Sequence, residues 1–452
     1  MKQVKRRTWF CLLFTILLAA GLTIFLARYT ANGENWASFG ANKHIYDKSG
    51  QLISGAIFDR SGNTLYDAAA GTYSEDKTIR KATLHAVGDR AGNIATGAKS
   101  AFRENLSGFN PILGTTAGGH DLYLTLDENL CAAAYNALNG QKGTGGVYNY
   151  KTGEILCMVS TPTFDPAHPP ETVEGDSRYE GVYLNRFLSA AYTPGSVFKL
   201  VTAAAALETI PDLESRTFTC SGSLEIGGQA ITCPSVHGEM DFAGALANSC
   251  NGVFASLAVE LGGKTLEQYA EKAGLLDSLT VSGLSTASGS FTAAEDGSSD
   301  LGWSGVGQYQ DLVNPCAMMT FCGTIANRGT QVVPRLIRKE VTAAGLPAGI
   351  FRAEKHSGAM KSETCDALAE LMRNNVVNHY GQDRFGELAV CAKSGTAEVG
   401  DGRRPNAWFT GFIDDSSHPL AFVVVVENGG GGASVAGGIA AKVLNAAAEA
   451  GY

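Results

Sequence analysis

Residues 191–200 read Ala-Tyr-Thr-Pro-Gly-Ser-Val-Phe-Lys-Leu and place Ser196 three residues before Lys199, at the start of an apolar, helix-forming stretch. Because residues i and i+3 share one face of a helix, the Lys199 amine can reach the Ser196 hydroxyl. A lysine kept neutral by burial or by a neighbouring cation can act as the base that activates a serine. The helix N-terminus adds positive potential where an oxyanion would form. The stretch therefore predicts a serine nucleophile that needs no histidine.

Two further motifs follow Ser196 in chain order. Ser249-Cys250-Asn251 supplies a hydroxyl and an amide, and the Lys-Ser-Gly-Thr run at 393–396 supplies a cation and two hydroxyls. Each pattern alone is weak, because the chain repeats it in polar segments that are interpreted as turns between apolar stretches. These copies are Ser74–Lys77, Ser61–Asn63, Lys48–Gly50 and Lys151–Gly153. The functional interpretation depends on the ordered set of three motifs, each with matching surroundings.

The three motifs resemble the active-site motifs of penicillin-binding proteins and serine β-lactamases. Ser249 follows Ser196 by 53 residues and Lys393 follows Ser249 by 144, which is similar to the transpeptidase layout. Flanking segments are similar to that family as well, namely 248–254, 304–308, 314–319 and 407–412. Residues 58–63, Phe-Asp-Arg-Ser-Gly-Asn, look like a segment near the start of class B penicillin-binding proteins. The resemblance to this class covers about residues 118–452.

Alternating and continuous apolar runs predict the secondary structure. Strands are expected at 121–126, 146–150, 154–160, 388–399, 407–413 and 420–427, and a closing helix at 435–450. Asp127 is expected to cap a helix that runs to Leu138. Strands, a largely helical middle and strands again imply an α+β fold, with a mixed, mainly antiparallel sheet flanked by helices. This is the fold that the resemblance implies.

Three parts of the chain are expected. Residues 1–28 form a cytoplasmic tail and a transmembrane anchor, 29–119 a small β-rich pedestal and linker, and 120–452 the transpeptidase domain. The anchor is the uncharged run Thr8–Ala27, about one bilayer thickness as a helix. Basic residues precede it, which predicts a single-pass protein of the cell membrane with an extracytoplasmic catalytic domain. A cleaved signal peptide is the alternative, although the run is long for one.

Composition excludes some other classes of function. The formal charge is −9 and the bulk of the chain has no basic cluster, which argues against a nucleic-acid partner. The ten cysteines do not form a disulfide scaffold, but Cys220 and Cys233 bracket a Gly-rich stretch expected to be a hairpin. A disulfide between them is plausible in an extracytoplasmic protein, and the sequence leaves it open. No cysteine–histidine spacing suggests a metal site, and no metal or cofactor is expected.

The resemblance implies catalytic roles for five residues. Ser196 attacks a peptide carbonyl and becomes acylated, and Lys199 accepts its proton. Ser249 relays that proton to the leaving amine while Lys393 maintains a positive potential. Asn251 positions the amide of the donor peptide.

The third motif is expected to bind substrate. By resemblance, Ser394 and Thr396 hold the terminal carboxylate of a D-Ala-D-Ala stem peptide. The backbone N–H groups of Ser196 and Thr396 are the expected oxyanion hole. Gly395 lacks a side chain that would crowd a ligand pressed against the strand edge.

The implied function is that of a peptidoglycan D,D-transpeptidase that cross-links stem peptides and is acylated by β-lactams. Its expected partners are the stem peptides and the membrane, and a separate membrane glycan polymerase is a further candidate. A D,D-carboxypeptidase or a serine β-lactamase on the same fold are the alternatives. A β-lactam sensor is disfavoured, because only about seven residues precede the membrane span.

Overall fold

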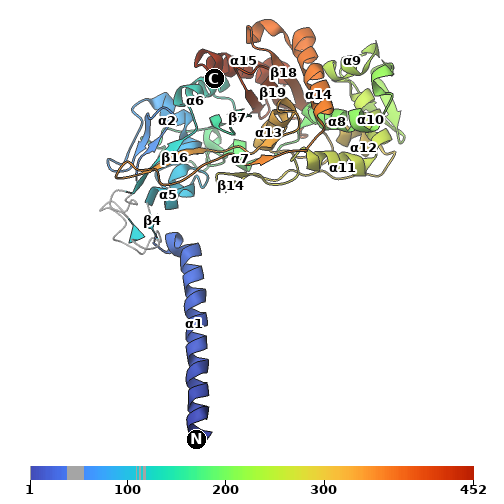
Figure 1. Cartoon of the computed structure of the whole chain (residues 1–452). Coiled ribbons are helices and arrows are strands. Elements are labelled where there is room, and N and C mark those ends of the chain that lie inside the picture. Colours follow the sequence, from blue (N-terminus) through green and yellow to red (C-terminus); the bar gives the residue numbers. More distant parts are fainter. Residues whose placement is uncertain (1, 38–54, 108, 111–113, 116–118) are drawn as a thin grey trace.

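The computed structural model describes residues 2–37, 55–107, 109–110, 114–115 and 119–452. Figure 1 shows a long N-terminal helix, α1 (Lys2–Ala37), leading to a body in which the N-terminal part lies at one end and a helical part at the other. The motif copy at 48–50 lies outside the described residues.

Helix α1 carries a long apolar run, and its residues 3–28 are exposed. Residues 3–33 of it are long and apolar enough to cross a membrane, with a mean hydropathy of 2.6 in the best window. It is the one helix in the described ranges that meets this test. Large exposed side chains such as Trp9, Phe10 and Phe14 would be costly in water, so this helix needs an apolar surrounding.

A five-stranded antiparallel sheet forms the centre of the body, in the order β18-β19-β20-β7-β8. Its strands are β7 (Gly143–Asn149), β8 (Ile155–Thr161), β18 (Val390–Ala397), β19 (Asn406–Ile413) and β20 (Leu420–Val426). Helix α13 (Pro315–Ala326) packs on one face, and α6 (Glu128–Leu138) and α15 (Gly437–Glu449) pack on the other (Figure 1). Because both faces are covered, β19 and β20 are buried throughout, which explains their continuous apolar runs.

A second sheet ties the N-terminal part to later segments. Its order is β16-β6-β1-β2-β3, and only β1 and β6 pair in parallel. The strands are β1 (Ile57–Phe58), β2 (Thr64–Asp67), β3 (Thr72–Tyr73), β6 (His120–Leu124) and β16 (Ile337–Thr342). Beside the predicted strands, this part contains four short helices: α2 (Lys77–Ala82), α3 (Leu84–Val87), α4 (Ala98–Ala101) and α5 (Arg103–Ser107).

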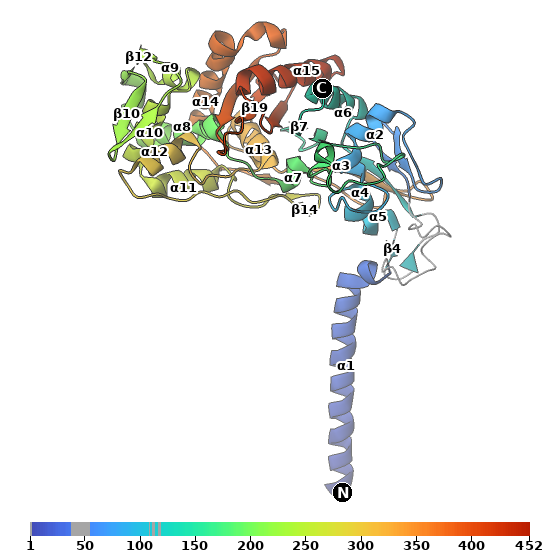
Figure 2. The ribbon, with the colours of Figure 1, turned by 180° about the vertical axis from the view of Figure 1, so that it is seen from behind.

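The middle of the chain is helical, as predicted. Its helices are α7 (Arg186–Ser189), α8 (Lys199–Thr209), α9 (Phe242–Ala247), α10 (Asn251–Leu261), α11 (Gly263–Lys272) and α12 (Ser299–Val306). Helix α14 (Ser362–Asn375) packs against both α8 and β18, and so joins the helical part to the edge of the central sheet. Figure 2 shows α8, α10 and α12 gathered on the side of the body away from α2 and α5.

Short elements complete the chain. The strands are β4 (Phe109–Asn110), β5 (Gly114–Thr115), β9 (Phe218–Cys220), β10 (Ser223–Ile226), β11 (Gln229–Thr232), β12 (Gly238–Met240), β13 (Thr280–Val281), β14 (Leu284–Ser285), β15 (Gln331–Val332) and β17 (Lys355–His356). The short helical turns are η2 (Ser177–Tyr179), η3 (Gly195–Val197), η4 (Leu213–Ser215), η5 (Val376–Tyr380), η6 (Gln382–Phe385) and η7 (Gly432–Ala436).

Local signals in the sequence are confirmed in several places. The Asp127 carboxylate accepts a hydrogen bond from the N–H of Leu130 at 2.9 Å and caps α6. The predicted hairpin at 221–232 is formed by β10 and β11. The copy at Lys151–Gly153 is the turn between β7 and β8, as expected, and the Asn149 side chain accepts from the N–H groups of Lys151 and Thr152.

Candidate active site

Ser196 lies in the turn η3, directly before α8, and two glycines hold this turn in place. The N–H of Gly195 donates to the carbonyl of Gly307 at 2.8 Å, and both glycines have positive φ, +55° and +85°. A Cβ on Gly307 would lie 2.1 Å from the Gly195 carbonyl oxygen, so only glycine fits there. On the other side, Trp408 Nε1 donates to the carbonyl of Thr193 at 3.1 Å. The backbone that carries the Ser196 hydroxyl is therefore fixed from β19 and from the end of α12.

The second motif lies at the N-terminus of α10. Ser249 precedes the helix in the left-handed conformation, with φ +54°, and Cys250 is the N-cap residue. A non-glycine residue in this region is unusual and is held there by its surroundings. This backbone conformation turns both the carbonyl and the hydroxyl of Ser249 toward Lys199.

The Lys199 amine is fully buried and binds the second motif. It donates to the Ser249 carbonyl at 2.6 Å, to the Ser249 hydroxyl at 3.2 Å and to Asn251 Oδ1 at 2.8 Å. Burial lowers the pKa of Lys199 well below its ordinary value, and the nearby Lys393 lowers it further. Within the described residues no hydrogen bond joins this amine to the Ser196 hydroxyl, although the sequence predicts that the two can meet. Such contacts often tighten only when substrate is bound.

Lys393 approaches the same serine from the central sheet. It lies in β18, which pairs with β19 along its whole length, and its amine donates to Ser249 Oγ at 3.0 Å and to the Ser394 carbonyl at 2.8 Å. The side chain is fully buried, and burial lowers the pKa of Lys393 to about 7. The Ser249 hydroxyl thus lies within hydrogen-bond reach of two lysines whose amines are readily neutral.

The other residues of the third motif follow along β18. The N–H and the hydroxyl of Ser394 both donate to the Tyr380 hydroxyl, at 3.0 and 3.1 Å. Thr396 Oγ1 accepts a hydrogen bond from the N–H of Gly432 at 3.2 Å. The sequence did not point to Tyr380, because its contact with β18 depends on how η5 packs behind the strand.

The packing of the protein itself gives a reason for glycine at position 395 that the sequence did not predict. A Cβ on it would lie 2.8 Å from the Pro194 carbonyl oxygen and 3.1 Å from Val197. These are atoms of the turn that carries Ser196, so Gly395 makes room for the protein's own backbone. The prediction that a side chain here would also crowd a ligand stays a prediction.

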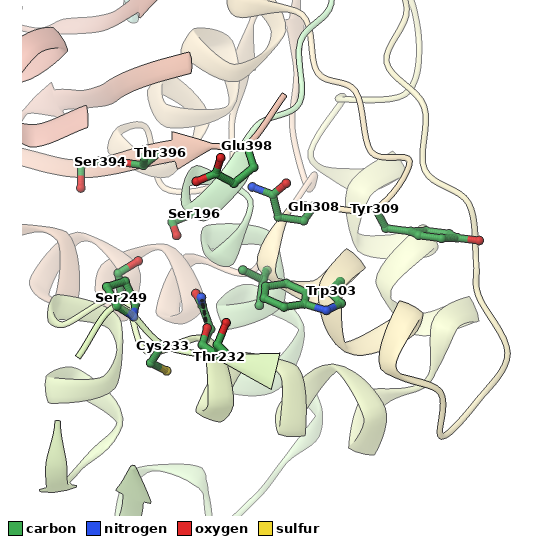
Figure 3. A pocket seen from close by; sticks show the side chains of 13 residues that line it. Ser196, Thr232, Cys233, Ser249, Trp303, Gln308, Tyr309, Ser394, Thr396 and Glu398 are labelled. Carbon is green, nitrogen blue, oxygen red and sulfur yellow. Dashed lines mark hydrogen bonds between the residues drawn. The ribbon is translucent and has the colours of Figure 1, made fainter. Parts of the chain in front are cut away.

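The three motifs line one pocket of about 700 Å³. Figure 3 shows Ser196, Ser249, Ser394 and Thr396 around it, with Gln308, Trp303 and Tyr309 along the opposite side. Glu398, two residues beyond the third motif, extends its carboxylate into the same space (Figure 3). Of the four named lining residues outside the three motifs, only Gln308 lies in a segment that the sequence analysis singled out. Trp303, Tyr309 and Glu398 carry no motif signal.

The cysteines and one histidine bear on a disulfide that the sequence left open and on the expectation of no metal site. Cys220 and Cys233 are both free thiols, so the disulfide considered between them is not formed. Cys233 Sγ lies instead 3.7 Å from Cys250 Sγ. Ligand atoms of Cys220, Cys233, His237 and Cys250 all lie within 4.8 Å of one another, a grouping that could hold a metal ion. No metal site was expected, because ligands separated by 13, 4 and 13 residues match no common metal motif.

The chain is similar to a known protein family and to curated proteins. The model of the penicillin-binding protein transpeptidase domain matches residues 143–446. Among curated proteins, the peptidoglycan D,D-transpeptidase PbpA of Mycobacterium tuberculosis is 27% identical over 365 residues, 75% of this chain and 73% of that protein. The stage V sporulation protein D of Bacillus subtilis is 29% identical over 351 residues, 72% of this chain and 52% of that protein.

Solved structures have the same fold. The D,D-transpeptidase domain of a peptidoglycan glycosyltransferase from Eggerthella lenta superposes with a TM-score of 0.75 at 26% identity, covering 88% of this chain and 98% of that one. The penicillin G acyl-enzyme complex of penicillin-binding protein A from M. tuberculosis has a TM-score of 0.76 at 23% identity, covering 87% and 99%. At 23% identity, the likeness to penicillin-binding protein A shows a shared fold alone.

Proposed function

The chain belongs to the penicillin-binding protein transpeptidase family, and from this premise we propose that it is a membrane-anchored peptidoglycan D,D-transpeptidase acting through an acyl-enzyme on Ser196. The observation that carries the proposal is the position of the Ser249 hydroxyl, 3.2 Å from the Lys199 amine and 3.0 Å from the Lys393 amine, beside the pocket that Ser196 lines. This arrangement provides a path for a proton without a histidine.

The chemistry begins at Ser196. Lys199 takes the hydroxyl proton as the serine oxygen attacks the carbonyl carbon of the donor peptide bond, and its lowered pKa favours the neutral amine that a base requires. The proton then passes through Ser249 to the leaving D-alanine amine, as that carbon–nitrogen bond breaks. Lys393 maintains the positive potential around the relay. Asn251, fixed by its bonds to Lys199 and to the Thr232 carbonyl, positions the donor amide.

Recognition of the donor is assigned to β18. Ser394 and Thr396 line the pocket and present hydroxyls to the terminal carboxylate of the stem peptide. Gly395 allows β18 to lie directly against the turn that carries Ser196. An amine from a second stem peptide then attacks the ester carbon and releases Ser196, which closes the cross-link. β-Lactams acylate Ser196 by the same route.

The surroundings of the enzyme are part of the proposal. We assign residues 1–28 to a cytoplasmic tail and a single transmembrane anchor, 29–119 to a pedestal and 120–452 to the extracytoplasmic transpeptidase domain. Strands β6 and β16 complete the sheet of the pedestal. A separate membrane glycan polymerase is the proposed partner. In support, a structural relative at 26% identity and TM-score 0.64 belongs to a complex described as coordinating polymerization and crosslinking.

Acylation by a fluorescent penicillin tests the proposal. The full-length protein in detergent should become labelled and keep its label for many turnover times of an acyl transfer, whereas Ser196→Ala should take up none. The melting temperature of Ser196→Ala should stay close to that of the wild type, because Ser196 is a partly exposed residue in the pocket. An unlabelled wild type with an intact fold would contradict the proposal.

The time course separates the alternatives on the same fold. A serine β-lactamase would lose its label through turnover, and the pocket carboxylate of Glu398 is the group to test as its base. A D,D-carboxypeptidase would release D-alanine from a pentapeptide without forming a dimer. Dimer formation with an amine acceptor supports the transpeptidase.

A further inference from the structure

Three thiols and an imidazole converge beside the second motif. Cys220 ends β9, Cys233 and His237 lie in the segment after β11, and Cys250 caps α10. One ligand atom from each lies within 4.8 Å of all the others. Among the residues that the structure describes, no other group of three or more potential ligands is gathered this way.

The distances fit a tetrahedral metal ion. Zinc binds thiolates at about 2.3 Å, so two thiolates on one tetrahedral zinc are about 3.8 Å apart. Cys233 Sγ and Cys250 Sγ are separated by 3.7 Å. A disulfide would require about 2 Å between the sulfurs, so the observed pair is spaced as two ligands of one ion. Three sulfurs and one nitrogen form a donor set that favours zinc over harder cations.

Two further contacts point to a ligand at this place. His237 Nδ1 is buried and has no hydrogen-bond partner. A buried ring nitrogen without a partner is costly, unless it binds something that the protein chain does not supply. The N–H of Gly252 donates to Cys233 Sγ at 3.4 Å, the kind of outer contact that supports a metal-bound thiolate.

The segment that supplies three of the ligands lacks a core of its own. Between residues 216 and 240, only Cys220 and Ile231 are buried, and most residues of β10 and β11 are exposed. Such a small excursion buries too little apolar surface to hold its own shape, and a bound metal is a common substitute for a core.

We propose that Cys220, Cys233, His237 and Cys250 bind one structural zinc ion, which fastens the β9–β12 excursion to the N-terminus of α10. Binding replaces the protons of the three thiols, and the neutral imidazole supplies the fourth ligand. No coordination position is left for substrate, because all four come from the protein.

The ion would also position the second motif. Cys250 lies between Ser249 and Asn251, and the zinc fixes its side chain while Ser249 keeps its left-handed backbone conformation. The Ser249 carbonyl and hydroxyl and the Asn251 side chain are the three groups that bind the Lys199 amine. In Figure 3 Cys233 lies beside Ser249 and Thr232 with its sulfur directed away from Ser196, so the zinc would lie behind the catalytic groups. Its role is that of a positioning element and not of a catalyst.

Metal content tests the site directly, without any substrate. Full-length protein purified in detergent under reducing conditions should contain about one zinc per chain by inductively coupled plasma mass spectrometry. Cys220→Ala and Cys233→Ala should each lower the zinc content at least fivefold. Cys365→Ala, which alters a buried cysteine on α14 outside the cluster, is the matched control and should keep its zinc.

A second measurement uses only the wild-type protein, so it does not depend on whether the variants fold. Wild-type protein stripped by a strong chelator and loaded with cobalt(II) should show the visible absorption of a tetrahedral thiolate site. Stripping should slow penicillin acylation at least tenfold, and adding zinc should restore it. The proposed zinc site would be overturned if the wild type holds no zinc after loading, or if the purified protein contains a Cys220–Cys233 disulfide. Zinc whose removal leaves acylation unchanged would overturn the positioning role. Because zinc content is measured without penicillin, a failure of this site is distinct from a failure of the transpeptidase proposal.

Discussion

Two buried lysines converge on one hydroxyl, and this is the feature that gives the site its chemistry. A charged amine loses hydration when it is buried, so both Lys199 and Lys393 favour the neutral form more than a lysine in water does. A charge on Lys393 further disfavours a charge on Lys199. The serine between them, Ser249, can therefore receive a proton from one side while a positive potential persists on the other. A site of this kind is built at the expense of stability.

The cost of burying Lys393 predicts that the effect of Lys393→Met on the free energy of unfolding depends on pH. The pKa of Lys393 is about 7 in the folded protein and 10.5 is its ordinary value, so the folded state disfavours the charged amine. Below pH 7 the amine is charged in both states and the full cost of burial applies. Above pH 10.5 it is neutral in both and the cost is absent. The Lys393→Met variant lacks this buried amine, and it also removes a charge that lowers the pKa of Lys199.

The difference in unfolding free energy between Lys393→Met and wild type should therefore be most favourable to the variant near pH 6 and should decrease toward pH 10. The difference between a pKa of about 7 and one of 10.5 corresponds to roughly 5 kcal/mol of unfolding free energy, as an upper bound. Denaturant unfolding at several pH values measures it, and acylation by penicillin should be lost in the same variant. Lys264→Met, at an exposed lysine on α11, is the control and should show no such trend. A difference that is independent of pH would contradict the burial argument.

The residues of the three motifs could be found from the sequence, because nucleophile, base and relay need specific functional groups at specific spacings. Their supports could not. Tyr380 and Glu398 reach the site through tertiary packing that leaves no local pattern. The contact of Gly395 with the Pro194 carbonyl was not predictable either, because only the folded chain brings the two together.

At the scale of elements, the active site lies where an edge of the central sheet meets the helical part. Strand β18 supplies Lys393 and the substrate edge, η3 supplies Ser196, and the N-terminus of α10 supplies the second motif. The strands and caps were predictable because they depend on local pattern, and β18, β19 and β20 lie within a few residues of their expected bounds. The convergence of Cys220, Cys233, His237 and Cys250 from β9, the segment after β11 and the N-terminus of α10 was not predictable, because it depends on the way a hairpin folds back onto a helix.

The contact between η3 and the end of α12 gives a prediction about Gly307→Ala. The new Cβ would lie 2.1 Å from the Gly195 carbonyl oxygen at a φ of +85°, so the turn that carries Ser196 must shift. We expect a loss of about 3 kcal/mol or more in unfolding free energy and at least a tenfold slower acylation. Gly283→Ala is the matched control, because its φ is +89° and its Cβ would meet nothing within 4 Å. That variant should lose about 1–2 kcal/mol and acylate normally. Equal effects of the two variants would rule out a special role for the η3 contact.

At the scale of the whole molecule, the sheet β16-β6-β1-β2-β3 joins the N-terminal part to one strand that precedes the first two motifs in the chain and one that follows them. A domain boundary at residue 119 therefore separates β1 from β6, two strands that pair with each other. Composition changes along the chain, whereas pairing links residues that are far apart in it. Helix α1 stands apart from this body and makes no contribution to the pocket lining.

Removing α1 should therefore change where the protein is found and leave its chemistry intact. Full-length protein should sediment with lipid vesicles and resist an alkaline carbonate wash, because an 18-residue window of mean hydropathy 2.6 is exposed on α1. A fragment of residues 38–452 should stay in the supernatant and react with penicillin within about twofold of the full-length rate. The Ser196→Ala form of each is the blank. A fragment that folds but acylates far more slowly would mean that the anchor supports the pocket. The intact mass of the protein from cells then separates an anchor from a cleaved leader, since only the anchor keeps the Thr8–Ala27 run in the mature chain.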